Sequence, residues 1–176
     1  MVRKKNGFSL IELLIVVAII LIIAAIAIPN LLRSKIAANE SSAVGSVRTI
    51  NTAEVTYQSS WGIGFAATLA NLGGPAPCTV ATAAAACLID PLLSTAPFTK
   101  SGYVFAAVGI YPVNGVLNGF EVNATPSVVQ TTGVRSFCGD HTGLIQFLAS
   151  GAAIGTAPGA CAAVPNALPA SGPIGN

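Results

Sequence analysis

The sequence predicts an α+β protein, in which a long N-terminal helix packs against a small antiparallel β-sheet and a disulfide ties the C-terminal loop. Three observations support this prediction. A long apolar run continues as a helical pattern to about residue 60, β-type segments begin after residue 100, and all four cysteines follow residue 77. We therefore expect a helix at residues 8–60 and an exported β-rich head at residues 61–176.

The composition limits the classes of function that this protein can have. Hydrophobic residues make up 53% of the 176 residues and charged residues only 8%, against ~25% in ordinary soluble proteins. Three of the eight basic residues, Arg3, Lys4 and Lys5, precede the apolar run, so the rest of the chain is nearly neutral. This balance excludes a highly charged disordered chain and a nucleic-acid binder with a dense basic surface. It favours a partner made of protein or lipid.

The apolar run is long enough to cross a membrane. It extends from Phe8 to Leu32, with Glu12 as its only charged residue. At 1.5 Å per residue, residues 8–32 cover a hydrocarbon core of ~30 Å. The basic cluster before them predicts a cytoplasmic N-terminus and an exported C-terminal portion.

A secretory signal peptide is the alternative explanation of this run. Its peptidase would cut after the run, where residues 24–27 include three alanines. The break that we favour, between Gly7 and Phe8, lies ahead of the run. Cleavage there removes the basic leader at residues 1–7 and keeps the helix.

The presence of a charged residue, Glu12, within the apolar run needs a physical explanation. A carboxylate in the middle of a membrane helix costs on the order of 2.5–3.5 kcal/mol and usually marks function. If Glu12 lies at the headgroup level, its carboxylate costs little. In the alternative, the carboxylate neutralises a positive group on another copy of the chain. Cleavage after Gly7 would create such a group, the amine of Phe8, four residues upstream.

The first thirty residues combine a short basic leader, the string GFSLIELL at residues 7–14 and an uninterrupted apolar helix. This combination resembles a type IV prepilin and, more widely, the pilins and the pseudopilins of type II secretion. The resemblance implies that a prepilin peptidase cleaves after Gly7 and methylates the Phe8 amine. It also implies that Glu12 attracts the Phe8 amine of an adjacent subunit during assembly. Pro29 lies where such pilins carry a helix-breaking proline, which removes a backbone donor.

Residues 33–60 continue the helix as an amphipathic segment. Apolar residues recur at three-, four- or seven-residue spacing and form one stripe: Ile36, Ala43, Val47, Ile50, Ala53 and Tyr57. A thin polar complement consists of Arg33, Lys35, Glu40, Arg48 and Glu54. We expect the stripe to support the protein's own head, and a helix of this length also requires a partner along it.

The head has β-type patterns at residues 103–111, 119–124 and 143–148, and residues 133–137 add a short fourth. Asn114-Gly115 and Asn118-Gly119 are expected as turns between the first two strands. From Ala149 onward Gly, Ala and Pro dominate, which predicts a wrapping loop. We expect a small antiparallel sheet on the exported half of the helix.

The four cysteines, Cys78, Cys87, Cys138 and Cys161, all lie in the predicted exported part. An even count outside the cytoplasm argues for two disulfides, and the sequence permits three connectivities. Proximity favours Cys78–Cys87 and Cys138–Cys161, and the second bond would tie down the tail. Each bond would stabilise the fold by roughly 3 kcal/mol.

The sequence offers little for catalysis. His141 is the only histidine, and with Cys138 it suggests a thiol–imidazole pair or the corner of a metal site. Such a site lacks further ligands, and a disulfide would remove the thiol, so we expect a turn residue. No enzyme, cofactor or metal is indicated. The sequons at Asn39 and Asn123 leave glycosylation open.

The resemblance implies a structural subunit of a type IV pilus, a homopolymer built through the N-terminal helix. Such a subunit starts as a single-pass inner-membrane protein and ends in an extracellular filament. Its partners are the prepilin peptidase, an inner-membrane platform and, indirectly, cytoplasmic ATPases. The family's roles are twitching motility, adhesion and DNA uptake, the last being the only route to nucleic acid.

Two alternatives to a pilus subunit remain. A type II secretion pseudopilin would form a periplasmic pseudopilus, and its major subunits often bind calcium through acidic C-terminal loops. The segment after Trp61 holds only Asp90, Glu121 and Asp140, a poor supply for a six- to eight-oxygen site. A membrane-anchored exported binding protein would leave the coincidence of Gly7, Phe8 and Glu12 unexplained.

Overall fold

A computed structural model describes residues 8–75, 77–165 and 170–174. The predicted leader at residues 1–7 therefore lies outside the described residues. The chain divides into two compact units, Met1–Lys35 and Ile36–Asn176. Helix α1 (Leu10–Trp61) contributes to both, and all other elements belong to the second unit.

Helix α1 is continuous over 52 residues, close to the predicted range. Pro29 lies inside it, and the residues on both sides are helical in the single chain. Unwinding at Pro29 within an assembled filament stays a prediction.

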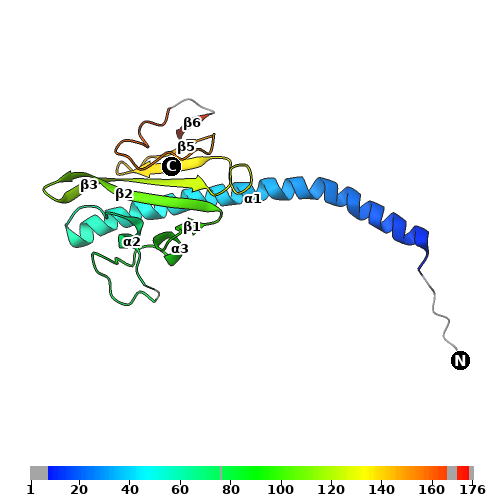
Figure 1. The fold of residues 1–176 in the computed structure, drawn as a ribbon, viewed down its shortest axis with the longest axis horizontal. Coiled ribbons are helices and arrows are strands. Elements are labelled where there is room, and N and C mark those ends of the chain that lie inside the picture. The colour runs from blue at the N-terminus through cyan, green and yellow to red at the C-terminus, as the bar shows by residue number, and fades with distance from the viewer. Residues whose placement is uncertain (1–7, 76, 166–169, 175–176) are drawn as a thin grey trace. The chain divides into compact units, whose positions relative to one another are not determined.

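The second unit contains a six-stranded antiparallel sheet whose strands follow the chain order β1-β2-β3-β4-β5-β6 (Figure 1). The strands are β1 (Thr99–Lys100), β2 (Tyr103–Val113), β3 (Val116–Pro126), β4 (Ser136–Asp140), β5 (Ile145–Leu148) and β6 (Ser171–Pro173). The predicted α+β fold is confirmed. The four predicted strands correspond to β2, β3, β4 and β5, whereas β1 and β6 were not predicted, because two or three residues carry no alternation.

One of the two predicted turns is correct. Asn114 and Gly115 have φ of 53° and 82° and connect β2 to β3, as the two-residue hairpin turn requires. The second prediction, Asn118-Gly119, is wrong, because both residues lie inside β3. A Cβ at Gly119 would lie 2.9 Å from the Tyr111 ring, so the glycine here permits close packing.

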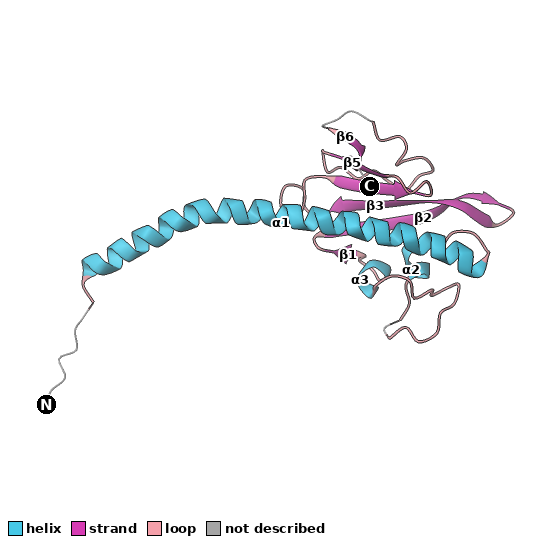
Figure 2. Cartoon of the chain, turned by 180° about the vertical axis from the view of Figure 1, so that it is seen from behind, coloured by secondary structure: helices cyan, strands magenta, loops and turns pink. Residues whose placement is uncertain are grey.

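The core lies between α1 and the sheet (Figure 2). Five of the six predicted stripe residues are buried on this face of the helix: Ala43, Val47, Ile50, Ala53 and Tyr57. They belong to one hydrophobic cluster with sheet residues that include Phe105, Phe120, Val122 and Phe137. Helix and sheet approach closely at Gly139 of β4, where a Cβ would lie 3.1 Å from a Val47 methyl group.

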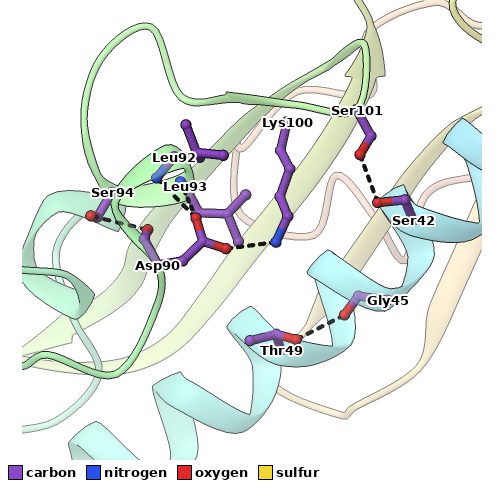
Figure 3. A network of polar contacts seen from close by, with 9 residues as sticks. All are labelled: Ser42, Gly45, Thr49, Asp90, Leu92, Leu93, Ser94, Lys100 and Ser101. Carbon is purple, nitrogen blue, oxygen red and sulfur yellow. Dashed lines mark hydrogen bonds and ion pairs between the residues drawn. The ribbon is translucent and has the colours of Figure 1, made fainter.

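Two short helices, α2 (Leu69–Leu72) and α3 (Pro91–Ser94), lie in the connection between α1 and β1. Asp90 caps α3 by accepting the N–H groups of Leu92 (2.9 Å) and Leu93 (3.2 Å), and it pairs with Lys100 of β1 at 2.6 Å. Figure 3 shows these contacts, together with the Ser42 hydroxyl of α1 donating to the Ser101 hydroxyl. The connection is thereby fastened to β1, and the turn after β1 is fastened to α1.

The structure contains both disulfides that proximity favoured, Cys78–Cys87 and Cys138–Cys161. The second bond joins β4 to the C-terminal segment and forms a small hydrophobic cluster with Val164. Glu121 of β3 holds the same segment by accepting the N–H groups of Gly159 (2.8 Å) and Cys161 (3.2 Å). The predicted disulfide-tied C-terminal loop is confirmed.

Candidate functional site

The site with the most distinctive chemistry is the start of α1. The helix begins at Leu10, and the Leu13 N–H donates to the Ser9 carbonyl at 3.2 Å. Glu12 Oε2 accepts the N–H of Ser9 at 2.9 Å. This contact is one half of a capping box, in which an acidic residue three positions after the N-cap satisfies a backbone donor that the helix leaves unpaired.

The apolar half of α1 exposes its side chains. Its most apolar 18-residue window has a mean hydropathy of 3.3, and none of that window is buried. Phe8, the first described residue, is 74% exposed. By length and composition this helix is able to cross a membrane, but a signal sequence near an N-terminus has the same character. The motif around Glu12 is therefore needed to distinguish a retained membrane helix from a signal sequence.

Comparison with known proteins bears on this motif. Residues 2–28 match the family model described as the prokaryotic N-terminal methylation motif. Residues 2–28 are therefore called the methylation-motif segment below. The match runs through Phe8, Glu12 and most of the apolar run.

Two curated relatives extend the similarity to type IV major pilins. The chain is 44% identical over 54 residues to the type IV major pilin protein PilA of Myxococcus xanthus, covering 31% of this chain and 24% of that protein. It is 59% identical over 39 residues to the type IV wide pilus major component PilA4 of Thermus thermophilus, covering 22% of this chain and 30% of that protein. The matched part thus spans about a quarter to a third of these relatives. No solved structure matches significantly.

The roles predicted for single residues of the methylation-motif segment stay predictions. Gly7, the expected cleavage residue, lies outside the described residues. In the single chain the Glu12 carboxylate contacts the Ser9 N–H. The expected pairing of Glu12 with the Phe8 amine belongs to an assembly of several copies, which a single chain does not test.

A second polar site fastens the head to α1. Glu40 Oε1 accepts the N–H groups of Val134 (2.9 Å) and Arg135 (3.0 Å), and Oε2 accepts Nε (2.9 Å) and Nη2 (2.7 Å) of Arg135. Burial opposes ionisation of Glu40, but these hydrogen bonds and the Arg135 charge outweigh it. The pKa of Glu40 is therefore lowered. The carboxylate is an anchor for the segment that leads into β4.

Replacing this anchor is expected to weaken the head. Glu40→Ala leaves two backbone N–H groups without their acceptor and should lower the free energy of unfolding by about 2 kcal/mol. Urea unfolding of the detergent-solubilised chain, followed by the fluorescence of Trp61, measures this loss. Ser41→Ala, at the exposed neighbouring position, is the control. An equal stability of the two variants would contradict the anchoring role.

Glu54 is fully buried on the same face of α1. Its Oε2 accepts the N–H of Ala66 at 2.8 Å, whereas Oε1 finds no hydrogen-bond partner among the described residues. Burial raises the pKa of Glu54 to about 7, and the Ala66 hydrogen bond opposes the rise only in part. The second unit, Ile36–Asn176, therefore holds a carboxyl group that is largely protonated below neutral pH.

The sequence predicted that Glu40 and Glu54 lie on the polar side of the helix, and this prediction is wrong. Both are buried, at 7% and 0% exposure. A signal was present in the sequence, because the spacing of three and four residues connects each glutamate to the stripe: Glu40, Ala43, Val47, Ile50, Glu54 and Tyr57. Their charge led to the wrong assignment.

The remaining candidates carry no site of their own. The Cys138 thiol is used in a disulfide, and the exposed His141 lies edge-on against Tyr111, with ring centroids 5.9 Å apart. Among the residues that the structure describes, His, Cys, Asp and Glu do not gather in groups of three that would hold a metal. The Asn39 amide donates to the Thr132 carbonyl, and Asn123 is buried in β3.

Proposed function

We propose that this protein is a structural subunit of a type IV pilus, which polymerises with copies of itself through the apolar N-terminal helix. The observation that supports it is the methylation-motif segment together with the exposed apolar run at residues 8–32, in which Glu12 is the only charged residue. An apolar surface of this size needs cover by lipid or protein. In the proposal, lipid covers it before assembly and other copies cover it afterwards.

In this proposal the chain passes from the membrane into the filament. Residues 1–7 are a leader that a prepilin peptidase removes after Gly7, residues 8–32 first span the inner membrane and then form the filament core, and residues 33–60 carry the exported head at residues 61–176. The inner-membrane platform and cytoplasmic ATPases drive assembly from outside the filament. The finished pilus is extracellular and serves motility, adhesion or DNA uptake.

Processing gives a prediction for the mature chain. Mass spectrometry of the purified protein should find an N-terminal methylated phenylalanine at Phe8, because cleavage after Gly7 exposes that amine. The mass should also be lower by four hydrogens than that of the reduced chain, one pair for each disulfide. A chain that retains residues 1–7 would contradict the processing, and free thiols would contradict the disulfides.

Electron microscopy of sheared cell-surface fibres, combined with peptide identification, tests the function itself. The expected result is a surface fibre in which peptides of this chain are the main component. A fibre that stays in the periplasm and appears only with type II secretion would identify a pseudopilin instead. A protein recovered only from membranes, in cells that form fibres without it, would contradict both.

A further inference from the structure

The two disulfides of the second unit differ in their access to solvent. Cys78 is exposed and Cys87 is half-buried, in the connection between α2 and α3. Cys138 and Cys161 are 0% and 1% exposed, and Val164 packs against their bond. A disulfide is exchanged when a thiolate attacks one of its sulfur atoms, so the rate depends on access to that atom. Of the two bonds, Cys78–Cys87 is therefore the one open to a thiol in solution.

The surroundings of the Cys78–Cys87 bond leave room for an attacking group. Gly74 lies against the Cys78 sulfur at a point where a Cβ would overlap it, so this neighbour adds no side chain over the sulfur. The next residues along the chain, Thr79 and Val80, are exposed. Residues 73–89 include no charged residue, so an anionic thiol meets no repulsion from this stretch of the chain.

The chain that follows this loop is held in place by contacts other than the disulfide. The Tyr57 hydroxyl of α1 donates to the Ala83 carbonyl at 2.7 Å, and Ala86 is buried in the core. Three backbone N–H groups donate to the end of α2 and the residue after it at 2.7–2.8 Å: Ala86 to Asn71, Cys87 to Gly73 and Leu88 to Leu72. Opening the bond therefore frees residues 78–81 and leaves the rest of the second unit folded.

We propose that Cys78–Cys87 is a site of thiol–disulfide exchange for a low-molecular-weight thiol such as glutathione, whereas Cys138–Cys161 is inert in the folded chain. The product is a chain that carries the small thiol on Cys78 and a free thiol on Cys87. This inference does not depend on the proposed pilus function, because it needs only the folded second unit.

The exchange step balances without an external oxidant or reductant. The thiolate of the small molecule attacks Sγ of Cys78 and forms a mixed disulfide with it. The bond to Sγ of Cys87 breaks, and this sulfur leaves with the electron pair and takes up the proton that the attacking thiol released. Sγ of Cys87 lies 3.8 Å from the Ala85 carbonyl oxygen, which accepts the S–H group once it has formed.

Timed exchange with reduced glutathione tests this proposal. The detergent-solubilised full chain is incubated without denaturant at about pH 8, where a thiol is partly ionised. Samples are quenched with acid, free thiols are alkylated, and the peptides that contain the cysteines are identified by mass spectrometry. Trp61 emission checks the fold during the reaction, since the ring lies 5.0 Å from the Tyr57 ring, whose hydroxyl holds Ala83. A parallel reaction in urea exposes both bonds.

The expected result is glutathione on Cys78 and an alkylated Cys87, while Cys138–Cys161 stays intact and Trp61 emission stays that of the folded chain. A buried bond reacts only in molecules that have opened, on the order of one in a thousand or fewer, so the exposed bond should react about a thousandfold faster. In urea the two rates should become similar.

Three results would each overturn the proposal. The first is a similar rate for both bonds in the folded chain, the second is glutathione on Cys87 with a free Cys78, and the third is exchange that occurs only together with the Trp61 emission of the unfolded chain. A large difference between the two bonds that persisted in urea would also contradict it, because burial would then not be the cause.

A matched pair of double variants provides an independent measurement. Cys78→Ser combined with Cys87→Ser removes the proposed site, so the folded variant should take up no glutathione. Cys138→Ser combined with Cys161→Ser keeps the site and, below its unfolding temperature, should react at Cys78 at the rate of the wild-type chain. Thermal unfolding of both variants shows the temperatures at which they are folded. Wild-type uptake by the folded first variant would contradict the assignment.

Discussion

A Glu12→Ala variant is expected to insert into the membrane as the wild-type chain does and to be missing from filaments. In the proposed assembly, the Glu12 carboxylate neutralises the Phe8 amine of an adjacent subunit in apolar surroundings. Removing one partner of a buried ion pair costs about 3–5 kcal/mol, so incorporation should fall at least about a hundredfold. The measurement is the ratio of variant to wild-type chain in the sheared and membrane fractions of co-expressing cells.

The contact of Glu12 with Ser9 makes a second variant necessary, because Glu12→Ala also removes a helix cap. Glu12→Gln keeps an amide oxygen that accepts the Ser9 N–H and removes only the charge. If the charge pairs with the Phe8 amine, both variants fail to assemble. If Glu12 only caps the helix, the glutamine variant assembles and the alanine variant does not. Normal assembly of both would refute both roles.

The stability of the second unit, Ile36–Asn176, is expected to fall as the pH rises from about 5 to about 7, because of Glu54. Burial raises the pKa of Glu54 from 4.5 to about 7, so between these values the folded chain binds the proton more tightly than the unfolded chain. The stabilisation is therefore complete below pH 4.5 and is lost as the pH rises through the folded pKa. Each pKa unit corresponds to ~1.4 kcal/mol, so the loss amounts to about 3 kcal/mol.

Glu54→Gln isolates this effect. Glutamine keeps an oxygen for the Ala66 N–H but does not titrate, so its free energy of unfolding should lack the decline with pH. Urea unfolding of both chains in detergent, between pH 5 and pH 8.5, gives the difference between their stabilities. That difference should change by about 3 kcal/mol in favour of the variant as the pH rises. Parallel curves would contradict a buried, unpaired carboxyl group.

Local patterns made several features of the head predictable. The Asn114-Gly115 turn fixed the hairpin of β2 and β3, since few residue pairs adopt positive φ at both positions. Proximity favoured the observed disulfides. Asn118-Gly119 had the same local signal and was misread, because the Tyr111 ring, packed against Gly119, decides the role of this pair.

By itself the sequence determined the N-terminal methylation motif, the long helix and the central strands, because each depends on neighbours within a few residues. The tertiary structure decided the roles of the two glutamates of α1. Glu40 finds its partner Arg135 95 residues later in the chain, and Glu54 is buried because the segment at Ala66 folds back over it. A charged residue in a helical stripe becomes an anchor or a buried acid according to the distant segment that covers it, and no local pattern specifies that segment.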